Sequence, residues 1–362
     1  MAATAVALVA VALVDALHAP GNDPAGVKIV EWLRGHGVGG LVNDVERWWY
    51  TRHPPRVGGR PRHGIPHARP PVVPAHAVAP APVVAPSERP ANLVPIASPA
   101  LPLEGVWQPT GKLVDGRPAV YETFLRPDPV HTSLVTGVVW MDRTLLRGAL
   151  YNGLQVPGGG PWQHGARLAP SDDAAVVAAF NGGFRLDASR GGYLTEGRTV
   201  RPLVEGRASL VITRDGTVSV GQWGRDATLT PDVVSVRQNL DLIVDGGRPV
   251  PGLITNDHGR WGATLGGKVF VWRSGVGVDR NGNLIYVGGP GLDITTLANV
   301  LARAGAVRAM ELDINSEWVT FNFYGGWSAT IAQKLLPDMT RDPTRYLSPD
   351  DRDFIAVFAR RG

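Results

Sequence analysis

Cysteine is absent from this chain of 362 residues. Its absence excludes a disulfide framework, a thiolate nucleophile and a cysteine-ligated metal, but it does not identify the compartment, because an exported protein can lack disulfides. The sequence also lacks the Gly-x-Ser-x-Gly, His-Glu-x-x-His and EF-hand patterns, and no glycine-rich stretch has the spacing of a Walker loop or a dinucleotide fingerprint. Chemistry that depends on these motifs is therefore not indicated.

A large excess of either charge is missing as well. Residues 103–362 hold 27 Lys and Arg against 26 Asp and Glu, and the small basic excess lies before them, in a proline-rich stretch. A nucleic-acid-binding protein concentrates basic side chains on its folded domain. We therefore expect no nucleic-acid partner.

Apolar residues are plentiful, at 44% of the chain, and they are accompanied by 45 Gly and 31 Pro. This composition suits a folded protein with an irregular appendage, and it excludes a chain that is wholly disordered, collagen-like or coiled-coil. Residues 54–102 contain 14 of the prolines and are typical of an extended, semi-rigid linker. We expect this linker to separate an N-terminal segment from a single domain at residues 103–362.

Residues 1–19 contain an unbroken apolar run, Ala5–Val14. The run is shorter than the roughly 20 residues that span a bilayer, but it has the length of the apolar region of a signal peptide. Ala19 follows at a plausible cleavage distance, whereas the usual Lys or Arg before the run is missing. Either the segment is a signal or anchor, which predicts a secreted or N-terminally membrane-anchored protein, or it is a short apolar helix without a targeting role.

Residues 20–53 have the apolar spacing of two short amphipathic helices that are broken between Gly35 and Gly40. Trp48, Trp49 and Tyr50 end this segment. They would lie either at a membrane interface or against the main domain. The sequence alone leaves both interpretations open.

The domain at residues 103–362 is predicted to be a strand-rich α+β domain. Short β-like runs separated by turn signals recur along it, without the regular alternation of strand and helix that a doubly wound sheet requires. One helix is predicted over Thr295–Ala304, with Asp293 as its cap and Gly305 as its end. The expected strands are 119–124, 133–141, 175–180, 208–213, 218–221, 242–244, 268–272, 284–287 and 309–314.

Three motifs in this domain could carry chemistry. In the first, a strand leads into Asn181-Gly182-Gly183, where glycines permit close approach of a ligand or another chain and Asn181 offers both a donor and an acceptor. In the second, Arg273 is followed by Ser274 and Gly275, so that a guanidinium fork and backbone amides could meet phosphate oxygens. The alternative for the first motif is a tight turn, and the alternative for Arg273 is a structural ion pair.

In the third motif, Glu311, Asp313 and Asn315 alternate with apolar residues. If this stretch is a strand, all three share one face, and two neighbouring carboxyl groups suit general acid and base chemistry. A solvated face on an edge strand is the alternative. His258 lies in a Gly-flanked loop where it could titrate near neutral pH, and Asp245 precedes two glycines that favour a hairpin turn.

Taken in order, the Asn181, Arg273 and Glu311-Leu312-Asp313 motifs, with the helix between the last two, resemble the phosphodiester glycosidase family, which includes the lysosomal uncovering enzyme. The resemblance covers roughly residues 170–358 and implies a mixed α+β domain that acts outside the cytoplasm on a sugar phosphodiester, such as a wall polymer. The family typically shows Leu-Asp-Gly-Gly-Gly-Ser where this chain has Leu-Asp-Ile-Asn-Ser-Glu at residues 312–317. The bulkier residues there favour, as an alternative, a wall-glycan-binding domain that has lost turnover.

The hypothesis from these motifs is an exported hydrolase in which Arg273 clamps the phosphate and Asp313 acts as nucleophile or base. Glu311 or His258 would supply the proton. No cofactor is certain, although Asp and Asn oxygens could hold Ca²⁺. The residues expected to bind substrate are Asn181, Gly182, Gly183, Ser274, Gly275, Asn315 and Asp245.

Overall fold

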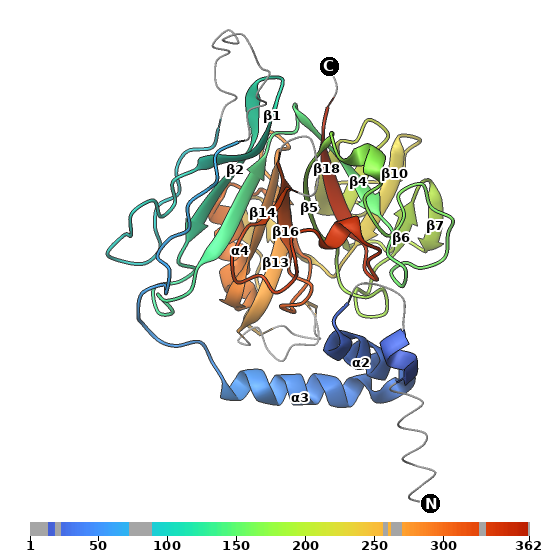
Figure 1. Ribbon diagram of the computed structural model, residues 1–362, viewed down its shortest axis with the longest axis horizontal. Coiled ribbons are helices and arrows are strands. Elements are labelled where there is room, and N and C mark those ends of the chain that lie inside the picture. The colour runs from blue at the N-terminus through green and yellow to red at the C-terminus, as the bar shows by residue number, and fades with distance from the viewer. Residues whose placement is uncertain are drawn as a thin grey trace, which may run out of the picture.

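The computed structural model describes residues 14–18, 23–71, 89–255, 260–261, 270–325 and 331–360. It is rich in strands, with 33% of the described residues in strands and 15% in helices. The strands form the body of the molecule, and the first helices lie below it in Figure 1. The predicted α+β class, with a helical segment before the domain, is confirmed.

The described residues of the domain form three antiparallel sheets. The largest has eight strands in the order β1 (Gln108–Val114), β2 (Arg117–Leu125), β3 (Thr136–Met141), β14 (Leu284–Leu292), β13 (Val271–Val278), β15 (Arg308–Glu311), β11 (Leu242–Asp245) and β12 (Arg248–Pro249). A second sheet orders β17 (Ala332–Lys334), β16 (Phe321–Tyr324), β5 (Val176–Asn181), β18 (Phe354–Ala359) and β4 (Leu146–Tyr151). The third orders β7 (Arg198–Arg201), β6 (Tyr193–Thr195), β10 (Val233–Gln238), β8 (Ala208–Thr213) and β9 (Val218–Gln222).

Both faces of the eight-stranded sheet are covered. One face carries helix α4 (Ile294–Arg303), whose side chains Leu297 and Leu301 pack against the sheet. The other face packs against the second and third sheets in one large apolar cluster. The Asp293 side chain accepts a hydrogen bond of 2.6 Å from the Thr296 amide, so this helix begins at the cap that the sequence predicted.

The two glycines of β13 serve packing. A Cβ at Gly275 would lie 2.9 Å from Leu301 of α4, and a Cβ at Gly277 would lie 2.6 Å from the Arg308 carbonyl oxygen. Both residues are buried inside a paired strand, between β14 and β15. The expectation that their amides are exposed to a phosphate is therefore wrong, because the ladder and the covering helix occupy the space.

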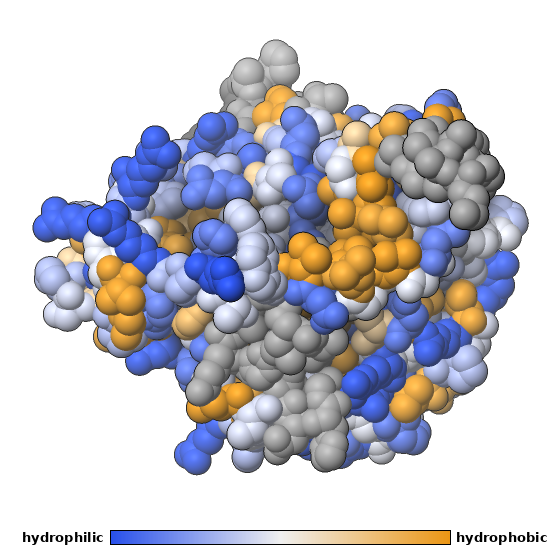
Figure 2. Space-filling model, turned by 90° about the horizontal axis from the view of Figure 1, so that it is seen from below, coloured by the Kyte–Doolittle hydropathy of each residue, from blue (hydrophilic) through white to orange (hydrophobic). Residues whose placement is uncertain are grey.

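Helices α2 (Ala25–Leu33) and α3 (Gly39–Arg52) form the N-terminal segment below the sheets (Figure 1). The chain bends between them at residues 34–38, where Gly37 has a φ of 84° that favours glycine. Trp48 and Trp49 of α3 are 52% and 53% exposed, so they do not pack against the domain. Figure 2 shows apolar residues gathered on this lower face.

The described parts of the proline-rich linker lie on the domain. Carbonyl groups of Ala97 and Pro99 accept hydrogen bonds from the buried Arg126 guanidinium, and Ile65 belongs to the main core. Polyproline-like backbone has no internal hydrogen bonds, which leaves its carbonyls free for such donors. These parts therefore do not act as a spacer. Within the described ranges, no helix is both long and apolar enough to cross a bilayer.

Candidate active site

The ends of three strands meet at one small pocket. Asn181 is the last residue of β5, Asp313 follows β15, and Arg352 and Asp353 precede β18. The amide of Gly182 bonds to the Asp353 carbonyl oxygen at 3.0 Å, which fixes the ends of β5 and β18 to each other. The residues that line the pocket are Asn181, Gly182, Gly183, Asp313, Trp318, Arg345, Tyr346, Arg352 and Asp353.

A chain of hydrogen bonds links Asn181 to Asp313 through Ser274. The Asn181 amide nitrogen donates to Ser274 Oγ at 3.0 Å, and Ser274 Oγ accepts from the Asp313 backbone amide at 3.3 Å. Asn181 Oδ1 accepts from the Tyr286 hydroxyl at 3.0 Å and from the Thr320 amide at 3.1 Å. The structure thus brings together Asn181, Ser274 and Asp313 as expected, but Asn181 acts on the neighbouring protein groups rather than pointing freely at a ligand.

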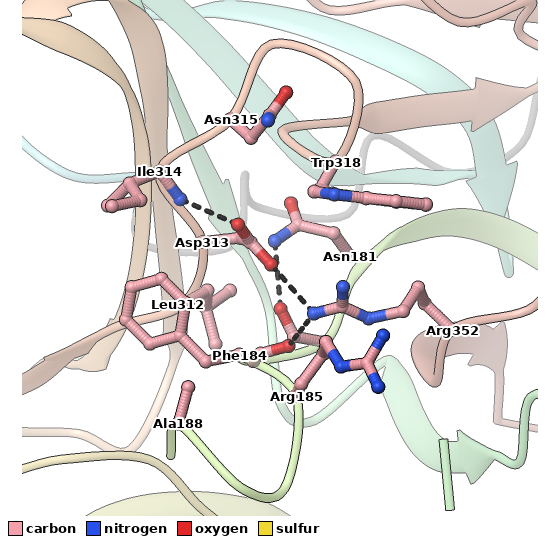
Figure 3. A network of polar contacts seen from close by, with 12 residues as sticks. Asn181, Phe184, Arg185, Ala188, Leu312, Asp313, Ile314, Asn315, Trp318 and Arg352 are labelled. Atoms are coloured by element: carbon pink, nitrogen blue, oxygen red, sulfur yellow. Dashed lines mark hydrogen bonds and ion pairs between the residues drawn. The ribbon is translucent and has the colours of Figure 1, made fainter. Parts of the chain in front are cut away.

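Asp313 is the carboxyl group at the centre of the site (Figure 3). It is 4% exposed, and burial raises its pKa to about 6, although the Arg352 guanidinium and the Ile314 amide both act to lower it. Its Oδ2 accepts from Arg352 Nη2 at 3.1 Å and its Oδ1 accepts from the Ile314 amide at 2.8 Å. A carboxyl group with this pKa exists in both protonation states near neutral pH, which suits proton transfer.

Arg352 and Arg185 place two guanidinium groups beside Asp313 (Figure 3). Arg352 Nη2 also donates to the Gly183 carbonyl oxygen at 3.0 Å, and the Trp318 ring lies 4.8 Å from the guanidinium carbon. Arg185 directly follows Phe184, at the end of the first motif. The site therefore pairs Asp313 with the Arg352 guanidinium, and Arg185, which pairs with Glu31, adds a second guanidinium that can meet an anionic substrate.

A β-bulge separates the two acidic residues of the third motif. The Leu312 amide bonds to the Ser274 carbonyl oxygen at 2.8 Å, and the Ser274 amide bonds to the Asp313 carbonyl oxygen at 2.9 Å. Leu312 and Asp313 therefore both lie opposite Ser274, which defines a β-bulge. Because a bulge interrupts the period-two alternation, Glu311 and Asp313 do not share a face. The expectation of a common face is wrong for this reason.

Glu311 and Arg273 form a buried ion pair on the other face of the sheet, with 2.5 Å between Oε1 and Nη1. Arg273 also donates to the Leu292 carbonyl oxygen at 2.9 Å, and both side chains are at most 1% exposed. Burial raises the pKa of Glu311, and the guanidinium opposes that rise. The structure therefore supports the alternative for Arg273, a structural ion pair, and it brings neither residue to the pocket.

Other parts of the protein pack closely against Gly182 and Gly183, so these glycines do not leave open space for a ligand. A Cβ at Gly182 would lie 2.4 Å from Asp353 Oδ2, and a Cβ at Gly183 would lie 2.9 Å from the Asn239 side chain. Both glycines line the pocket as a consequence of this packing. Their presence in the first motif is thus explained by the arginine-bound Asp353 and by Asn239 behind them.

The remaining expected residues lie elsewhere. Asn315 Oδ1 accepts from the Glu317 amide at 2.9 Å and so shapes the loop after Asp313. Asp245 sits in the β11–β12 hairpin and pairs with Arg225 at 2.7 Å, which agrees with the turn interpretation and not with substrate binding. His258 lies outside the described residues.

Sequence reasoning missed Arg185, Arg352, Trp318 and Asp353. Arg185 could have been found, because it follows the Asn-Gly-Gly-Phe motif directly. Arg352 and Asp353 belong to a charged run, residues 350–353, just before an apolar strand, and nothing local indicates that this run returns to β5. In the described part of the chain, no group of three or more His, Asp or Glu side chains could hold a metal ion.

Comparison with known proteins identifies the central segment. The family model described as phosphodiester glycosidase matches residues 174–313, from the start of β5 to Asp313. Residues 174–313 are therefore similar to a phosphodiester glycosidase domain. The predicted resemblance is thereby confirmed, and the glycosidase segment includes Asn181, Arg185 and Asp313, whereas Arg352 lies beyond the matched residues. No curated protein matches the chain.

Two solved structures are similar to this chain at low sequence identity. One is the catalytic domain of zebrafish N-acetylglucosamine-1-phosphodiester alpha-N-acetylglucosaminidase, auto-inhibited by its pro-peptide, with a TM-score of 0.44 and 15% identity over 70% of this chain and 88% of that chain. Another is a hypothetical protein from Synechocystis, with a TM-score of 0.38 and 14% identity over 70% of this chain and 64% of that chain.

Proposed function

We propose that the protein is a hydrolase that cleaves the glycosidic bond of a sugar-1-phosphodiester, with Asp313 as its base or nucleophile. The observation that carries the proposal is the position of Asp313, a buried carboxyl group beside Arg352 in a pocket at the end of the glycosidase segment. Family membership of this segment supports a hydrolase of phosphodiester-linked sugars.

In the proposed reaction, water adds to the anomeric carbon, the bond from that carbon to the phosphate oxygen breaks, and a phosphomonoester leaves. As a base, Asp313 takes a proton from the water; as a nucleophile, it forms a glycosyl ester that water then hydrolyses. A phosphomonoester has a second pKa of about 6, so it leaves as a stable anion without a donated proton. Glycosidases with alcohol leaving groups use a second carboxyl group as the acid that protonates the leaving group. A phosphate leaving group needs no such acid, so turnover is compatible with the position of Glu311 outside the pocket.

The test uses the purified chain and a synthetic methyl diester of a sugar-1-phosphate in water enriched in ¹⁸O. The proposal requires free sugar and methyl phosphate, with the label in the sugar, because the bond at the anomeric carbon breaks. Label in the phosphate would show cleavage at phosphorus and would contradict it. Binding of the diester without any product would instead support the alternative, a glycan-binding domain without turnover, which the bulkier residues after Asp313 favour.

The pH dependence of the reaction follows from the pKa of Asp313. Since burial raises this pKa to about 6, the carboxylate that acts as base or nucleophile is lost as the pH falls through 6. We expect kcat/KM to be level above about pH 7 and to fall about tenfold per pH unit below about pH 5. A profile measured from pH 4 to 8 checks this, and a rate that increases on acidification would assign Asp313 the role of an acid.

We also propose that the protein works outside the cytoplasm, on a cell-wall or surface glycan, and that its N-terminal segment associates with a membrane. The apolar run Ala5–Val14 and the exposed α3 residues Leu41, Val45, Trp48 and Trp49, which share one helical face, support this location. Cell fractionation of the full chain tests it, and recovery in the cytoplasmic fraction alone would contradict it.

A further inference from the structure

Helix α2 buries a glutamate. Glu31 is 8% exposed, whereas its apolar neighbours Ile29 and Val30 are only partly buried. Removing an ionised carboxylate from water is costly unless cations compensate for the lost hydration. The position of Glu31 therefore indicates a cationic site on the surface that α2 covers.

The cations that bond to Glu31 are Arg185, beside the pocket, and Arg34. Glu31 Oε2 lies 2.8 Å from Arg185 Nη1, and Oε1 lies 3.0 Å from Arg34 Nη1 on the same N-terminal segment. Burial alone would raise the pKa of Glu31, but Arg352, Arg185 and Arg34 outweigh it and lower that pKa. Glu31 is thus a buried anion held by Arg185 of the domain and by Arg34 of its own segment, and its charge acts on Asp313.

Arg352 retains an unused donor. Its Nη2 bonds to Asp313 and to the Gly183 carbonyl oxygen, whereas its buried Nε has no hydrogen-bond partner within the described residues. A buried donor without a partner costs free energy that a bound acceptor would recover. An oxyanion placed between Arg352 and Arg185 would supply such an acceptor.

We propose that Arg185 and Arg352 form the subsite that binds the phosphodiester of the substrate, and that Glu31 occupies this subsite as an internal carboxylate. The inference rests on the proposed function and names the residues that recognise the phosphate. A phosphodiester carries one negative charge, as does the carboxylate. When Glu31 leaves Arg185, a monoanionic phosphodiester can therefore replace it charge for charge.

The subsite also has the right position for chemistry. Arg352 bonds to Asp313. A substrate phosphate bound to the same guanidinium would therefore place the anomeric carbon of the attached sugar next to the reacting carboxylate. A planar guanidinium fork matches a pair of phosphate oxygens and stabilises the charge that grows on the leaving group. The buried pair Asp23–Arg341, at 2.6 Å, also holds the start of the same segment on the domain, and we expect substrate to displace Glu31 from Arg185.

The test measures binding of dimethyl phosphate, a monoanionic phosphodiester, to the full chain by calorimetry at pH 7. Trimethyl phosphate, which has a similar shape without charge, is the control ligand. We expect Glu31→Gln to bind dimethyl phosphate at least tenfold more tightly than the wild type, and trimethyl phosphate to bind to neither. Adding Arg185→Gln to Glu31→Gln should remove the gain; thermal unfolding verifies that each variant is folded.

Asp187→Asn is the matched control variant. Asp187 also approaches Arg185, with 3.6 Å between Oδ1 and Nε, but it is an exposed residue outside the pocket. We expect this variant to bind dimethyl phosphate within twofold of the wild type. Unchanged binding by Glu31→Gln, or a gain that persists without Arg185, would overturn the proposed subsite.

The outcomes separate this inference from the proposed function. Tighter binding of dimethyl phosphate by Glu31→Gln, with no sugar released from the diester substrate, would support the subsite and contradict the hydrolase. Release of labelled sugar with no change in binding would support the hydrolase and contradict the subsite. When both hold, Glu31→Gln should raise kcat/KM mainly by lowering KM.

Discussion

Asp313→Asn is expected to reduce the rate of sugar release by at least about a thousandfold, because the amide can act neither as base nor as nucleophile. The substitution keeps the size of the side chain and one oxygen, which can still accept from either Arg352 or the Ile314 amide, the donors that bind the two different oxygens of Asp313. The fold should therefore persist. Single-turnover kinetics on the diester substrate, with the native sheets verified by circular dichroism, measure this loss.

Glu311→Gln is the control for Asp313→Asn, since it makes the same chemical change two residues away. Glu311 lies on the opposite face of the sheet and pairs with Arg273, so we expect its substitution to lower stability by about 3 kcal/mol while the folded protein keeps its turnover. Equal loss of turnover in both variants would contradict the assignment of chemistry to Asp313 alone. Full turnover in Asp313→Asn would contradict the proposed function itself.

Much of the fold could be predicted because its signals are local. Helix α4 has a capping aspartate and a terminal glycine, and the β13–β14 hairpin turns at Asn281-Gly282, where Gly282 has a φ of 83°. Strands such as β5 are buried along their whole length between two layers, so they show a continuous apolar run rather than alternation. Strands β16 and β18 were missed, although Gly325-Gly326 follows the first and Pro349-Asp350 precedes the second.

The site was harder to predict than the fold. The Asn181 and Asp313 motifs were found because each follows a strand and combines glycine or carboxylate with apolar flanks. The bulge at Leu312 and Asp313 separates the two carboxyl groups that were expected to share a face, and it depends on hydrogen bonds to Ser274 that no spacing rule contains. Arg352 and Glu31 reach the pocket only through tertiary structure, because they lie far from these motifs in the sequence.

Arg237→Leu should destabilise the domain by about 3–5 kcal/mol, because it leaves the Asp353 carboxylate buried without its partner. Arg237 bonds to Asp353 through Nε at 2.7 Å and Nη2 at 3.2 Å, and both side chains are at most 1% exposed. Arg237 also donates to the Gln238 and Phe184 carbonyl oxygens, so the pair connects β10 to the strand end that carries Gly182. Denaturant unfolding of the purified chain measures the loss.

The exposed pair Arg225–Asp245, at 2.7 Å, provides the comparison. Arg225 is 44% exposed, and solvent screens such a pair, so Arg225→Leu should cost at most about 1 kcal/mol. Adding Asp353→Asn to Arg237→Leu removes the unpaired charge and should restore part of the lost stability. A cost for Arg237→Leu no larger than that for Arg225→Leu would show that the buried pair does not hold β5, β10 and β18 around the site, and that the glycines at 182 and 183 need another explanation.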